Sequence, residues 1–414
     1  MTALGTDTAV LVVFGVVYLG MFLGGLPALK IDRTGVAVLG AIALIAITGL
    51  SLEEAARAVD LPTIVLLFAF MVVSAQMRLG GFYTAVTRAV AGRPMPRAAL
   101  LAALLGVAAM LSAVFSNDVV CLAMTPVVAR ICLQRGLHPV PFLVGLACAA
   151  NIGSAATLIG NPQNMLIGSV MDLSFGDYLA AAWPPVLASL VLLWLWLAAG
   201  PGARAAAAPQ PAAAEAEADD PPFDALQSAK GLLVAAVLFG VFLFTPWPRE
   251  VAALVGAGVL LLSRRLHSSQ VMGFVDWPLL LLFIGLFIVN HALAQSGLAG
   301  EAVAALRAQG VVLSEPGTLL VLGVLLSNAV SNVPAVMLLL PHLGDAGAQG
   351  GTLLALASTF AGNLLLVGSI ANLIVADLAQ KAGVPFGWRE HAAIGVPVTL
   401  LSLGVLWGWM RLVS

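Results

Sequence analysis

An apolar segment of this chain is interrupted by the polar sequence Asn151-Ile-Gly-Ser-Ala-Ala-Thr-Leu-Ile-Gly-Asn-Pro-Gln-Asn164, and a second segment by Gly362-Asn-Leu-Leu-Leu-Val-Gly-Ser-Ile-Ala-Asn372. Each interruption follows a short polar signal, Ser116-Asn-Asp118 in the first case and Ser331-Asn-Val-Pro334 in the second. In hydrocarbon an unpaired backbone group costs several kcal/mol, so irregular polar backbone survives there only where it is buried or lines a cavity. Two such pairs in one chain therefore predict a polar site where two repeats meet.

The composition is that of a membrane protein. Of the 414 residues, 61% are hydrophobic and 9% are charged, with a mean hydropathy of +1.05. Soluble domains carry roughly 25% charged residues. Many apolar stretches approach the roughly 20 residues that cross a bilayer, which indicates a polytopic membrane protein in contact with lipid. Nothing in this pattern indicates a nucleic-acid partner.

Self-comparison indicates two copies of one unit. An offset of 216 pairs Arg33 and the residues after it with Arg249, and Val59-Asp-Leu-Pro62 with Val275-Asp-Trp-Pro278. The offset is 215 between Asn117 and Asn332, and 208 between Gly160 and Gly368. A nearly constant offset over four segments is typical of an internal repeat.

The predicted domains are a first repeat over 1–199, a cytoplasmic linker over 200–228 and a second repeat over 229–414. Each repeat is expected to contain three spans, an amphipathic arm, a hairpin, a broken span and a final span. In chain order, these are 10–28, 34–50, 61–79, 82–93, 97–134, 140–170 and 178–199, then 229–245, 250–264, 277–294, 298–309, 315–341, 350–381 and 390–411. The Ala- and Pro-rich composition of the segment between the repeats predicts a flexible linker.

The two hairpins are predicted to be re-entrant. Pro341 follows Asn332 by nine residues, and at 1.5 Å per residue that arm is too short for a core of about 30 Å. The first hairpin is assigned by the repeat relation. Five crossings per repeat is an odd number, so the second repeat is inverted. The fold class is therefore all-α, with two inverted-topology repeats, about ten crossings, two re-entrant hairpins and two broken helices.

The charges orient this topology. With both termini outside, 14 of the 18 Lys and Arg residues fall on the inner side, as the positive-inside rule requires. The first hairpin then enters from the cytoplasm and the second from outside. The segment from Ala9 to Leu29 has no preceding basic residue, and we expect it to be a retained span.

The expected site combines the hairpin tips with the breaks. A re-entrant tip exposes N–H groups where one half-helix begins and C=O groups where the other ends, which suit an anion and a cation respectively. We expect one half-site from the first hairpin and first break, and its mate from the second pair. The predicted substrate-binding residues are Ser116, Asn117, Asn161, Ser331, Asn332 and Ser369. The predicted cation- or proton-coupling residues are Asp118, Asn151, Gly160, Asn363, Gly368 and Asn372.

Asp118 is the most informative single residue. A carboxylate at the centre of a membrane helix costs roughly 2.5–3.5 kcal/mol and is therefore normally functional. Two readings remain open and compatible, a cation or proton site and a cap on the second half-helix. The second repeat has Val333 at the aligned position, so either role would be asymmetric.

Other polar residues have simpler expected roles. Asp60 and Asp276 precede Pro at span starts and are expected to cap helices. Asn290 and His291 form either a proton relay or packing contacts, and Asp377 lies on an ion path or at a solvated helix end. The remaining histidines, His138, His267, His342 and His391, are expected in loops or interfaces. Cys121, Cys132 and Cys148 have no metal-ligand spacing and are expected to be packing residues.

The motif Ser116-Asn-Asp-Val-Val-Cys-Leu-Ala-Met-Thr-Pro126, with the first break, resembles the ion transporter superfamily over nearly the whole chain. That group includes divalent anion/sodium symporters, arsenite permeases and citrate-transporter-like proteins, and the chain is most similar to the small bacterial "anion transporter" branch. The resemblance implies an elevator mechanism with a scaffold that is often dimeric. It also implies that Ser116, Asn117, Ser331 and Asn332 touch substrate while the tips and breaks bind sodium. Asp118 and Val333 stand where the dicarboxylate members have Thr.

The sequence thus predicts a secondary active transporter of a small anion, a carboxylate or an oxyanion, coupled to Na⁺ or H⁺. The alternatives are a cation/proton antiporter with Asp118 as the exchange site and an arsenite-type permease. An enzyme is not expected, because no intramembrane His/Glu or Ser/His cluster appears. No cofactor or resident metal is expected. The expected location is a bacterial inner membrane, and a homodimer is the assembly that the resemblance implies.

Overall fold

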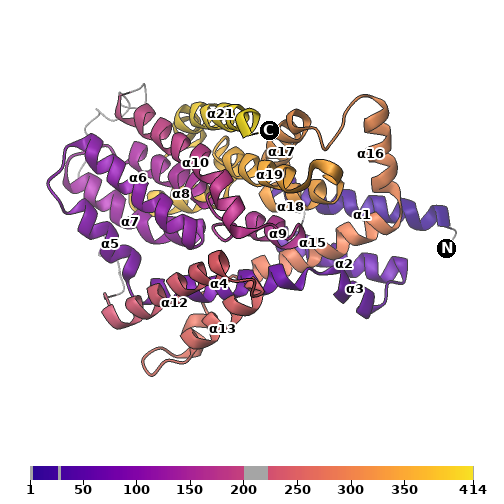
Figure 1. Cartoon of the computed structure of the whole chain (residues 1–414), viewed down its shortest axis with the longest axis horizontal. Helices are drawn as coiled ribbons and strands as arrows, with labels where there is room; N and C mark the ends of the chain where they lie inside the picture. The colour runs from indigo at the N-terminus through magenta and orange to yellow at the C-terminus, as the bar shows by residue number, and fades with distance from the viewer. Residues whose placement is uncertain (1–2, 27–28, 200–221, 414) are drawn as a thin grey trace.

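The computed structural model describes residues 3–26, 29–199 and 222–413, and nearly all of them are helical (Figure 1). The described residues also include one short antiparallel pair, β1 (Gly25–Leu26) and β2 (Ile31–Asp32). Eight helices of the described part are long and apolar enough to cross a membrane. The protein is an all-α polytopic membrane protein.

The described helices before residue 200 include five that are long and apolar enough to cross a membrane, and several shorter ones. In chain order they are α1 (Ala3–Leu23), α2 (Arg33–Thr48), α3 (Leu52–Ala58), α4 (Leu61–Leu79), α5 (Phe82–Ala91), α6 (Arg97–Val114), α7 (Asn117–Gln134), α8 (Pro139–Ser154), α9 (Pro162–Val170) and α10 (Phe175–Ala198).

The helices after residue 221 repeat this order. They are α12 (Ala225–Phe244), α13 (Arg249–Leu261), α14 (Ser268–Met272), α15 (Trp277–Gln295), α16 (Leu298–Ala308), α17 (Pro316–Val330), α18 (Asn332–Leu339), η1 (Leu340–His342), η2 (Gly344–Ala346), α19 (Gly347–Ala361), η3 (Leu366–Gly368), α20 (Ile370–Lys381) and α21 (Trp388–Val413).

Equivalent helices begin with equivalent caps. The Asp60 carboxylate accepts the N–H of Thr63 at 2.9 Å at the start of α4, and the Asp276 carboxylate accepts the N–H of Leu279 at 3.0 Å at the start of α15. Pro follows within the first turn of both helices, where its missing N–H costs nothing. The capping role expected for both aspartates is confirmed.

Helices of one half pack against helices of the other half. α2 packs on α15, α13 packs on α4, and α10 packs on α21. Gly285 on α15 allows the close approach of α2, since a Cβ there would come within 2.8 Å of the Ala37 backbone. Exchanged contacts of this kind are what two repeats related by a pseudo-twofold axis produce.

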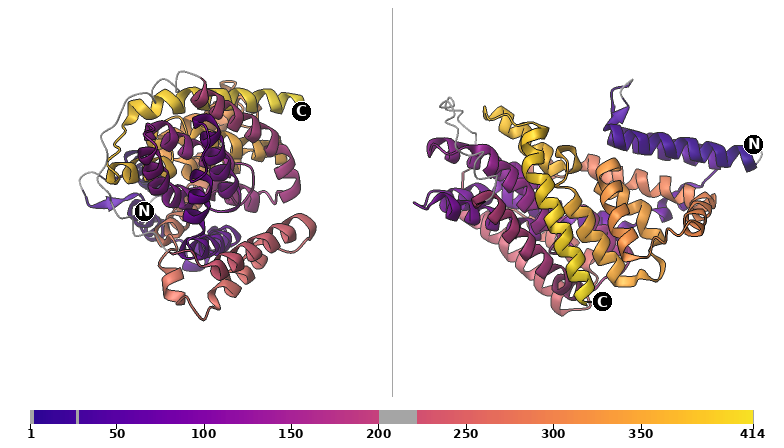
Figure 2. Two further views of the ribbon diagram at one scale, coloured as in Figure 1. Left: turned by 90° about the vertical axis from the view of Figure 1, so that its left-hand side faces the viewer. Right: turned by 90° about the horizontal axis from the view of Figure 1, so that it is seen from above.

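The helices form two bodies (Figures 1 and 2). We call α6–α10 and α17–α21, with their hairpins and breaks, the hairpin body. We call α1, α2, α4, α12, α13 and α15 the scaffold. In Figure 1 the scaffold lies along the bottom and toward the N-terminus, whereas α10 and α21 lie on the opposite side of the hairpin body.

Several boundaries differ from the sequence expectation. α1 ends at Leu23, where Gly24 adopts a positive φ of 83°, rather than at residue 28. α12 begins at Ala225, inside the predicted linker, because Asp224 caps it; residues 200–221 of that linker lie outside the described residues. The short helices α3 and α14 and the strand pair were not expected.

The hairpin arms differ in length. α18 has 8 residues, so at 1.5 Å per residue it cannot cross a bilayer even with the 3-10 turn η1 after it. α6 and α7 have 18 residues each and count among the eight long apolar helices. Length alone therefore does not distinguish the first hairpin from two crossings. In the ten-crossing topology, the shorter α2 and α13 and the two broken helices complete the count.

Candidate functional site

Each break is packed against the first arm of its own hairpin. A Cβ at Gly160 would overlap Ser154 O and come within 2.8 Å of Ser112 O. A Cβ at Gly368 would lie 3.0 Å from Asn328 Oδ1 and 3.2 Å from Gly362 O. Residues 112 and 328 differ by the repeat offset of 216, and 154 and 362 by 208. At Gly160 only glycine fits, because backbone oxygens occupy the space of a side chain, whereas at Gly368 a side chain would require Asn328 to shift by a few tenths of an ångström.

The centre of the site is a hydrogen-bond network around Asn151. Its Oδ1 accepts from Asn117 Nδ2 at 2.9 Å and from Ser369 Oγ at 3.1 Å. Its Nδ2 donates to Asn363 Oδ1 at 2.8 Å and to Asn372 Oδ1 at 3.2 Å. All five side chains are buried. Asn151, in the last turn of α8, thus joins the first hairpin tip to the second break.

A second network surrounds Thr359, which stands 208 residues after Asn151. Its hydroxyl accepts from Asn161 Nδ2 at 3.2 Å and from Gln163 Nε2 at 3.1 Å. Asn161 also donates to Ser154 Oγ at 3.0 Å, and its Oδ1 accepts the N–H of Asn164 at 2.9 Å. Thr359, in the last turn of α19, is therefore bonded to the first break.

These two networks correct one expectation. Two separate half-sites were expected, each made from one hairpin and its own break. The hairpins do touch their own breaks, but Asn151 and Thr359 each bond to the break of the other repeat. α7 correspondingly packs on α20, and α18 packs on α9. The polar centre is therefore one site to which both repeats contribute.

The two hairpin tips have different backbones. Ser116 has an ordinary φ of −58°, whereas Ser331 has φ 78° and ψ 159°, a region that glycine occupies almost alone. Holding a serine there costs of the order of 1–3 kcal/mol and is typical of functional sites. The strain singles out the second tip.

Five oxygens in the hairpins are buried and have no hydrogen-bond partner among the described residues. They are Ser112 Oγ, Asn117 Oδ1, Ser327 Oγ, Asn328 Oδ1 and Asn332 Oδ1. Four of them form two equivalent pairs, since 112 and 328 differ by 216 and 117 and 332 by 215. Buried acceptors without partners call for a ligand, an ion or water. Their repetition at matching places in both hairpins makes these oxygens a candidate cation-binding set.

Asp118 lies in the first turn of α7 and is partly exposed. The N-cap residue of α7 is Ser116, whose side chain makes no capping hydrogen bond, and the capping reading of Asp118 stays a prediction. Its carboxylate remains beside the positive end of α7, where a negative charge is favoured. The cation or proton reading stays a prediction.

Asn372 stabilises the backbone of the second break. Asn372 Nδ2 donates to Gly362 O at 2.8 Å and to Leu365 O at 3.1 Å. The first break is buried throughout, from Ala155 to Asn161, whereas Leu365 and Val367 in the second are 43% and 56% exposed. The second break is therefore the accessible one.

A cavity of about 710 Å³ reaches this second break. Scaffold residues of α1, α2 and α15, including Arg33 and Asp276, line one side, and Asn328, Ser331 and Val367 line the other. In the predicted topology, the ends of α1, α2 and α15 that line it are cytoplasmic. The strained tip is thus open to one side of the protein.

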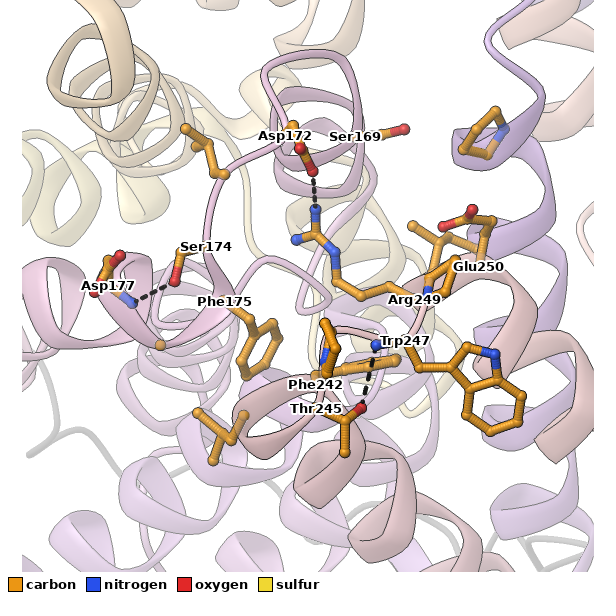
Figure 3. Close-up of a pocket in the computed structure, with 17 residues that line it drawn as sticks. Ser169, Asp172, Ser174, Phe175, Asp177, Phe242, Thr245, Trp247, Arg249 and Glu250 are labelled. Carbon is orange, nitrogen blue, oxygen red and sulfur yellow. Dashed lines mark hydrogen bonds and ion pairs between the residues drawn. The ribbon is translucent and has the colours of Figure 1, made fainter.

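The equivalent place in the first repeat also has a cavity, of about 730 Å³ (Figure 3). Arg249 and Pro62 line it where Arg33 and Pro278 line the other. The hairpin-body residues that line it are Ser169 and residues 172–177, at the end of α9 and the start of α10, rather than a hairpin tip. The two cavities are equivalent in the scaffold and different in the hairpin body.

Scaffold side chains bond to α9 and to the turn after it beside the 730 Å³ cavity. Arg249 donates to Gly168 O at 3.0 Å and lies 3.7 Å from the Asp172 carboxylate (Figure 3). Ser169 Oγ donates to Asp60 at 2.9 Å. α9 is therefore bonded to the scaffold, whereas its counterpart α20 faces the open cavity through Ile370 and Leu373.

His391 is a site residue that the sequence reasoning missed. It was expected in a loop or interface, but it is 1% exposed on α21, with Nε2 3.0 Å from Asn363 O. Thr359 and Tyr178 were missed as well. The repeat offset carries the only sequence signal for them, because 359 pairs with 151 and 391 with 178 once the final spans are aligned.

The other polar residues lie outside the centre. Asn290 Oδ1 accepts from Tyr18 at 3.0 Å within the scaffold, and His291 is half-buried beside it. Asp377 forms an exposed pair with Lys381 at 2.7 Å, which is the solvated helix end of the two readings. Cys121, Cys132 and Cys148 are free and buried, which is consistent with packing roles.

Broken helices and hairpin tips that meet at a polar centre inside a membrane protein define a transporter. The family model for the citrate transporter family, CitMHS, matches residues 9–361, and the chain belongs to this family. The chain is 30% identical to an uncharacterized transporter of Mycobacterium tuberculosis, over 92% of this chain and 94% of that one.

Two further likenesses cover almost the whole chain. The silicon efflux transporter LSI3 of rice, Oryza sativa subsp. japonica, is 30% identical over 95% of both proteins. The crystal structure of the YdaH transporter of Alcanivorax borkumensis superposes with a TM-score of 0.59 at 16% identity, over 99% of this chain and 97% of that one. The second likeness concerns the fold. The relatives are transporters, and this protein is a transporter rather than an enzyme.

Proposed function

We propose that this protein is a secondary active transporter that moves a small anion, a carboxylate or an oxyanion, together with Na⁺ or H⁺. The observation that carries the proposal is the pair of equivalent orphan acceptors in the two hairpins, Ser112 with Asn117 and Asn328 with Asn332. Neutral oxygens are ligands for a hard cation, and they place no fixed charge in the membrane.

The cation half of the proposal uses the breaks. Gly368 brings backbone carbonyls close to Asn328 Oδ1, and Gly160 does the same near Ser112. In broken-helix transporters, unwound carbonyls and half-helix ends coordinate Na⁺ or bind H⁺. Asn151, Asn363 and Asn372 then orient the amide groups around these places, and Asp118 adds a negative charge on one side only.

The anion half uses helix starts. α7 begins at Asn117, α18 at Asn332, α9 at Pro162 and α20 at Ile370, and all four starts belong to the tips and breaks. Each start presents free N–H groups and the positive end of a helix dipole. Ser116, Ser331, Asn161 and Ser369 add hydroxyl and amide donors beside them. Such a donor set suits a carboxylate or an oxyanion and does not select one.

Alternating access would follow from the unequal cavities. In the arrangement described, α9 is bonded to Asp60 and Arg249 while the second tip opens into the 710 Å³ cavity. An elevator movement of the hairpin body against the scaffold would close this cavity and open the equivalent one. We place the protein in a bacterial inner membrane with both termini outside, and we propose that it forms a homodimer through its scaffold.

A cation/proton antiporter is the second candidate. It is favoured by Asp118, a carboxylate in the first turn of a membrane half-helix with no capping hydrogen bond at that helix start. An arsenite-type permease is a related alternative, since the putative transporter arsB of Dictyostelium discoideum is 24% identical over 91% of this chain.

The test is counterflow in proteoliposomes. Labelled citrate, phosphate, arsenite and silicic acid are offered in turn, with Na⁺ or pH gradients imposed separately. Accumulation of one of them that depends on either gradient supports the proposal. Accumulation that ignores both gradients contradicts the coupling, and Na⁺/H⁺ exchange without any anion favours the antiporter.

A further inference from the structure

A pocket of about 310 Å³ lies between the ends of three helices of the second repeat. Its walls come from the starts of α17 and α19 and from the C-terminal end of α21, which lie together near the C-terminus in Figure 1. In the proposed topology all three ends are at the outer surface, at the level of the lipid head groups. None of the described residues of the hairpin tips and breaks lines this pocket.

The equivalent place in the first repeat, between α6, α8 and α10, is filled by the protein itself. Phe142 on α8 is 2% exposed, and the Arg97 guanidinium lies 5.9 Å from the centre of its ring. Arg97 also donates to Leu197 O at 3.3 Å, and Trp194 Nε1 donates to Ala98 O at 2.9 Å. These contacts join the three helices directly.

Sequence differences between the repeats leave the second place open. Phe142 and Arg97 correspond to Gly350 and Leu313, by the offsets of 208 and 216. The tryptophan of α10 is retained on α21 as Trp407, 213 residues later, which is also the distance between the starts of these two helices. Without the phenyl ring and the guanidinium, α17 and α21 pack less closely than α6 and α10 do. The second repeat therefore keeps the frame of the first and lacks the side chains that fill it.

Much of the lining is apolar. Leu319, Leu353 and Met410 line the pocket together with Trp407. Tryptophan at a helix end is typical of the membrane interface, where its ring contacts both lipid chains and head groups. The volume is at the lower end of the roughly 300–1,000 Å³ of ligand sites. The pocket is therefore large enough for a head group and the first part of a chain, and too small for a whole lipid.

Two opposite charges also line the pocket, Arg411 near the end of α21 and Glu315 directly before α17. The Arg411 guanidinium lies 4.7 Å from the centre of the Trp407 ring. Glu315 makes no capping hydrogen bond to α17, and among the described residues its carboxylate accepts only from Thr318 Oγ1, at 3.4 Å. The ion pairs of the described residues do not include one between Arg411 and Glu315. A ligand can therefore pair with both.

We propose that this pocket binds the head group of a zwitterionic phospholipid with a primary ammonium group, of the phosphatidylethanolamine type. The phosphate pairs with Arg411, because a guanidinium matches two phosphate oxygens at once. It also lies beside the starts of α17 and α19, where the partial positive charge of a helix favours an anion. The ammonium group donates to Glu315, and one acyl chain follows the apolar side chains.

The charges of the pocket favour this lipid over an anionic one. A zwitterion gives both Arg411 and Glu315 an opposite charge, whereas an anionic head group places a second negative group beside Glu315. The bound lipid joins α17 to α21, as Arg97 joins α6 to α10 in the first repeat. This binding does not depend on which substrate is transported.

The first experiment measures thermal unfolding of the delipidated full chain in detergent, with dioleoyl phosphatidylethanolamine, phosphatidylcholine or phosphatidylglycerol added in increasing amounts. We expect phosphatidylethanolamine to raise the melting temperature at about tenfold lower concentration than the other two, which is the effect of one charge-assisted hydrogen bond. Phosphatidylcholine has no N–H donor for Glu315, and phosphatidylglycerol has no positive charge.

Three variants locate this effect. Arg411→Gln should weaken the response to phosphatidylethanolamine about tenfold, and Glu315→Gln should remove the preference over phosphatidylglycerol. Gly317→Leu should abolish the response by filling the pocket, since a Cβ there lies 3.5 Å from Trp407 in ordinary contact. The matched control is Arg389→Gln at the other end of α21. Arg389 is exposed and also lies beside a tryptophan ring, at 5.3 Å, but outside the pocket, so its loss should change nothing.

Equal stabilisation by the three lipids overturns the proposal, and so does a stronger response to phosphatidylglycerol. Wild-type behaviour of Arg411→Gln or Gly317→Leu overturns it as well. If Gly317→Leu does not fold, photo-crosslinking of the wild type decides. Phosphatidylethanolamine with a photoactivatable acyl chain should label peptides that contain residues 314–319, 346–353 or 407–411. Labelling spread evenly over the other helices contradicts a site in this pocket.

Discussion

Asn151 Nδ2 donates a 2.8 Å hydrogen bond to Asn363 Oδ1, and this bond joins the two repeats at the point where both of their broken helices are interrupted. Both side chains are buried, and their positions are 212 residues apart. Because Asn151 also binds the first hairpin tip, the two breaks and this tip are held as one unit. A displacement of one break would therefore disturb the other.

Asn151→Ala should destabilise the protein by about 2–3 kcal/mol and abolish uptake. The substitution removes four hydrogen bonds and leaves buried partners unpaired, which costs more than the bonds contribute. Thermal unfolding in detergent and gradient-driven uptake measure the two effects. The matched control is Ser358→Ala, because Ser358 is also fully buried but donates only to Ala355 O within its own helix. Equal melting temperatures for the two variants would contradict the bridging role of Asn151.

Ser331→Gly should raise stability by about 1–2 kcal/mol and reduce uptake. Glycine adopts the observed φ of 78° without strain, while the hydroxyl beside the cavity is lost. Ser116→Gly is the control at the equivalent tip, where φ is −58° and glycine relieves nothing. The two melting temperatures should move in opposite directions. A stabilised variant with wild-type uptake would show that the strain has no part in transport.

Arg249→Gln should lower the population of the conformation in which α9 is bonded to the scaffold and the second hairpin tip opens into the 710 Å³ cavity. Arg249 bonds to Gly168 O and Asp172 from the scaffold, so its loss weakens the attachment of α9. The reporter is Val367→Cys, which is 56% exposed in the second-break cavity, while the native cysteines are buried. Its labelling rate with a membrane-impermeant maleimide should fall about fivefold or more, the effect of 1 kcal/mol or slightly more on a two-state equilibrium. Arg57→Gln removes an exposed pair with Glu53 and should leave the rate unchanged.

Asp118→Asn should uncouple transport. The substitution keeps the size of the side chain and removes the charge from the first turn of α7. Uptake along the anion gradient should persist, while accumulation driven by Na⁺ or pH should be lost. Val333→Asp is the reciprocal test, because it places a carboxylate at the aligned position of the second tip. Unchanged gradient dependence in Asp118→Asn would remove Asp118 from the coupling site.

Sequence patterns predicted most of the elements. The apolar runs, the Asp-Pro starts at Asp60 and Asp276, and the glycine-rich interruptions placed the spans and breaks within a few residues. The offset of 216 predicted the equivalence that the exchanged packing of α2 on α15 and α13 on α4 reflects. These features depend on neighbours in the chain, so local sequence is enough to reveal them.

The roles of individual site residues were harder to predict. Asp118 stands in the first turn of α7, and its two readings, a cation or proton site and a cap, both stay predictions. His391 looked like an interface residue because it stands near the start of a span, and only the packing of α21 on the second break shows its contact with Asn363. The sequence did not predict the pairing of Asn151 with the second break either, since no local pattern in the two segments indicates which residues contact each other.

The sequence by itself determined that this chain is a polytopic membrane protein, that two similar units compose it, and that polar interruptions and hairpin tips form its site. Hydrophobic length, glycine and proline positions and a constant offset are local or periodic properties, and they are written in the order of residues. Tertiary structure alone decided that each break is bonded to the other repeat, that Ser331 is strained, and which of two equivalent cavities reaches a tip. Those features arise from contacts between residues about 200 or more positions apart and from the balance between two nearly symmetric packings, which no local pattern encodes.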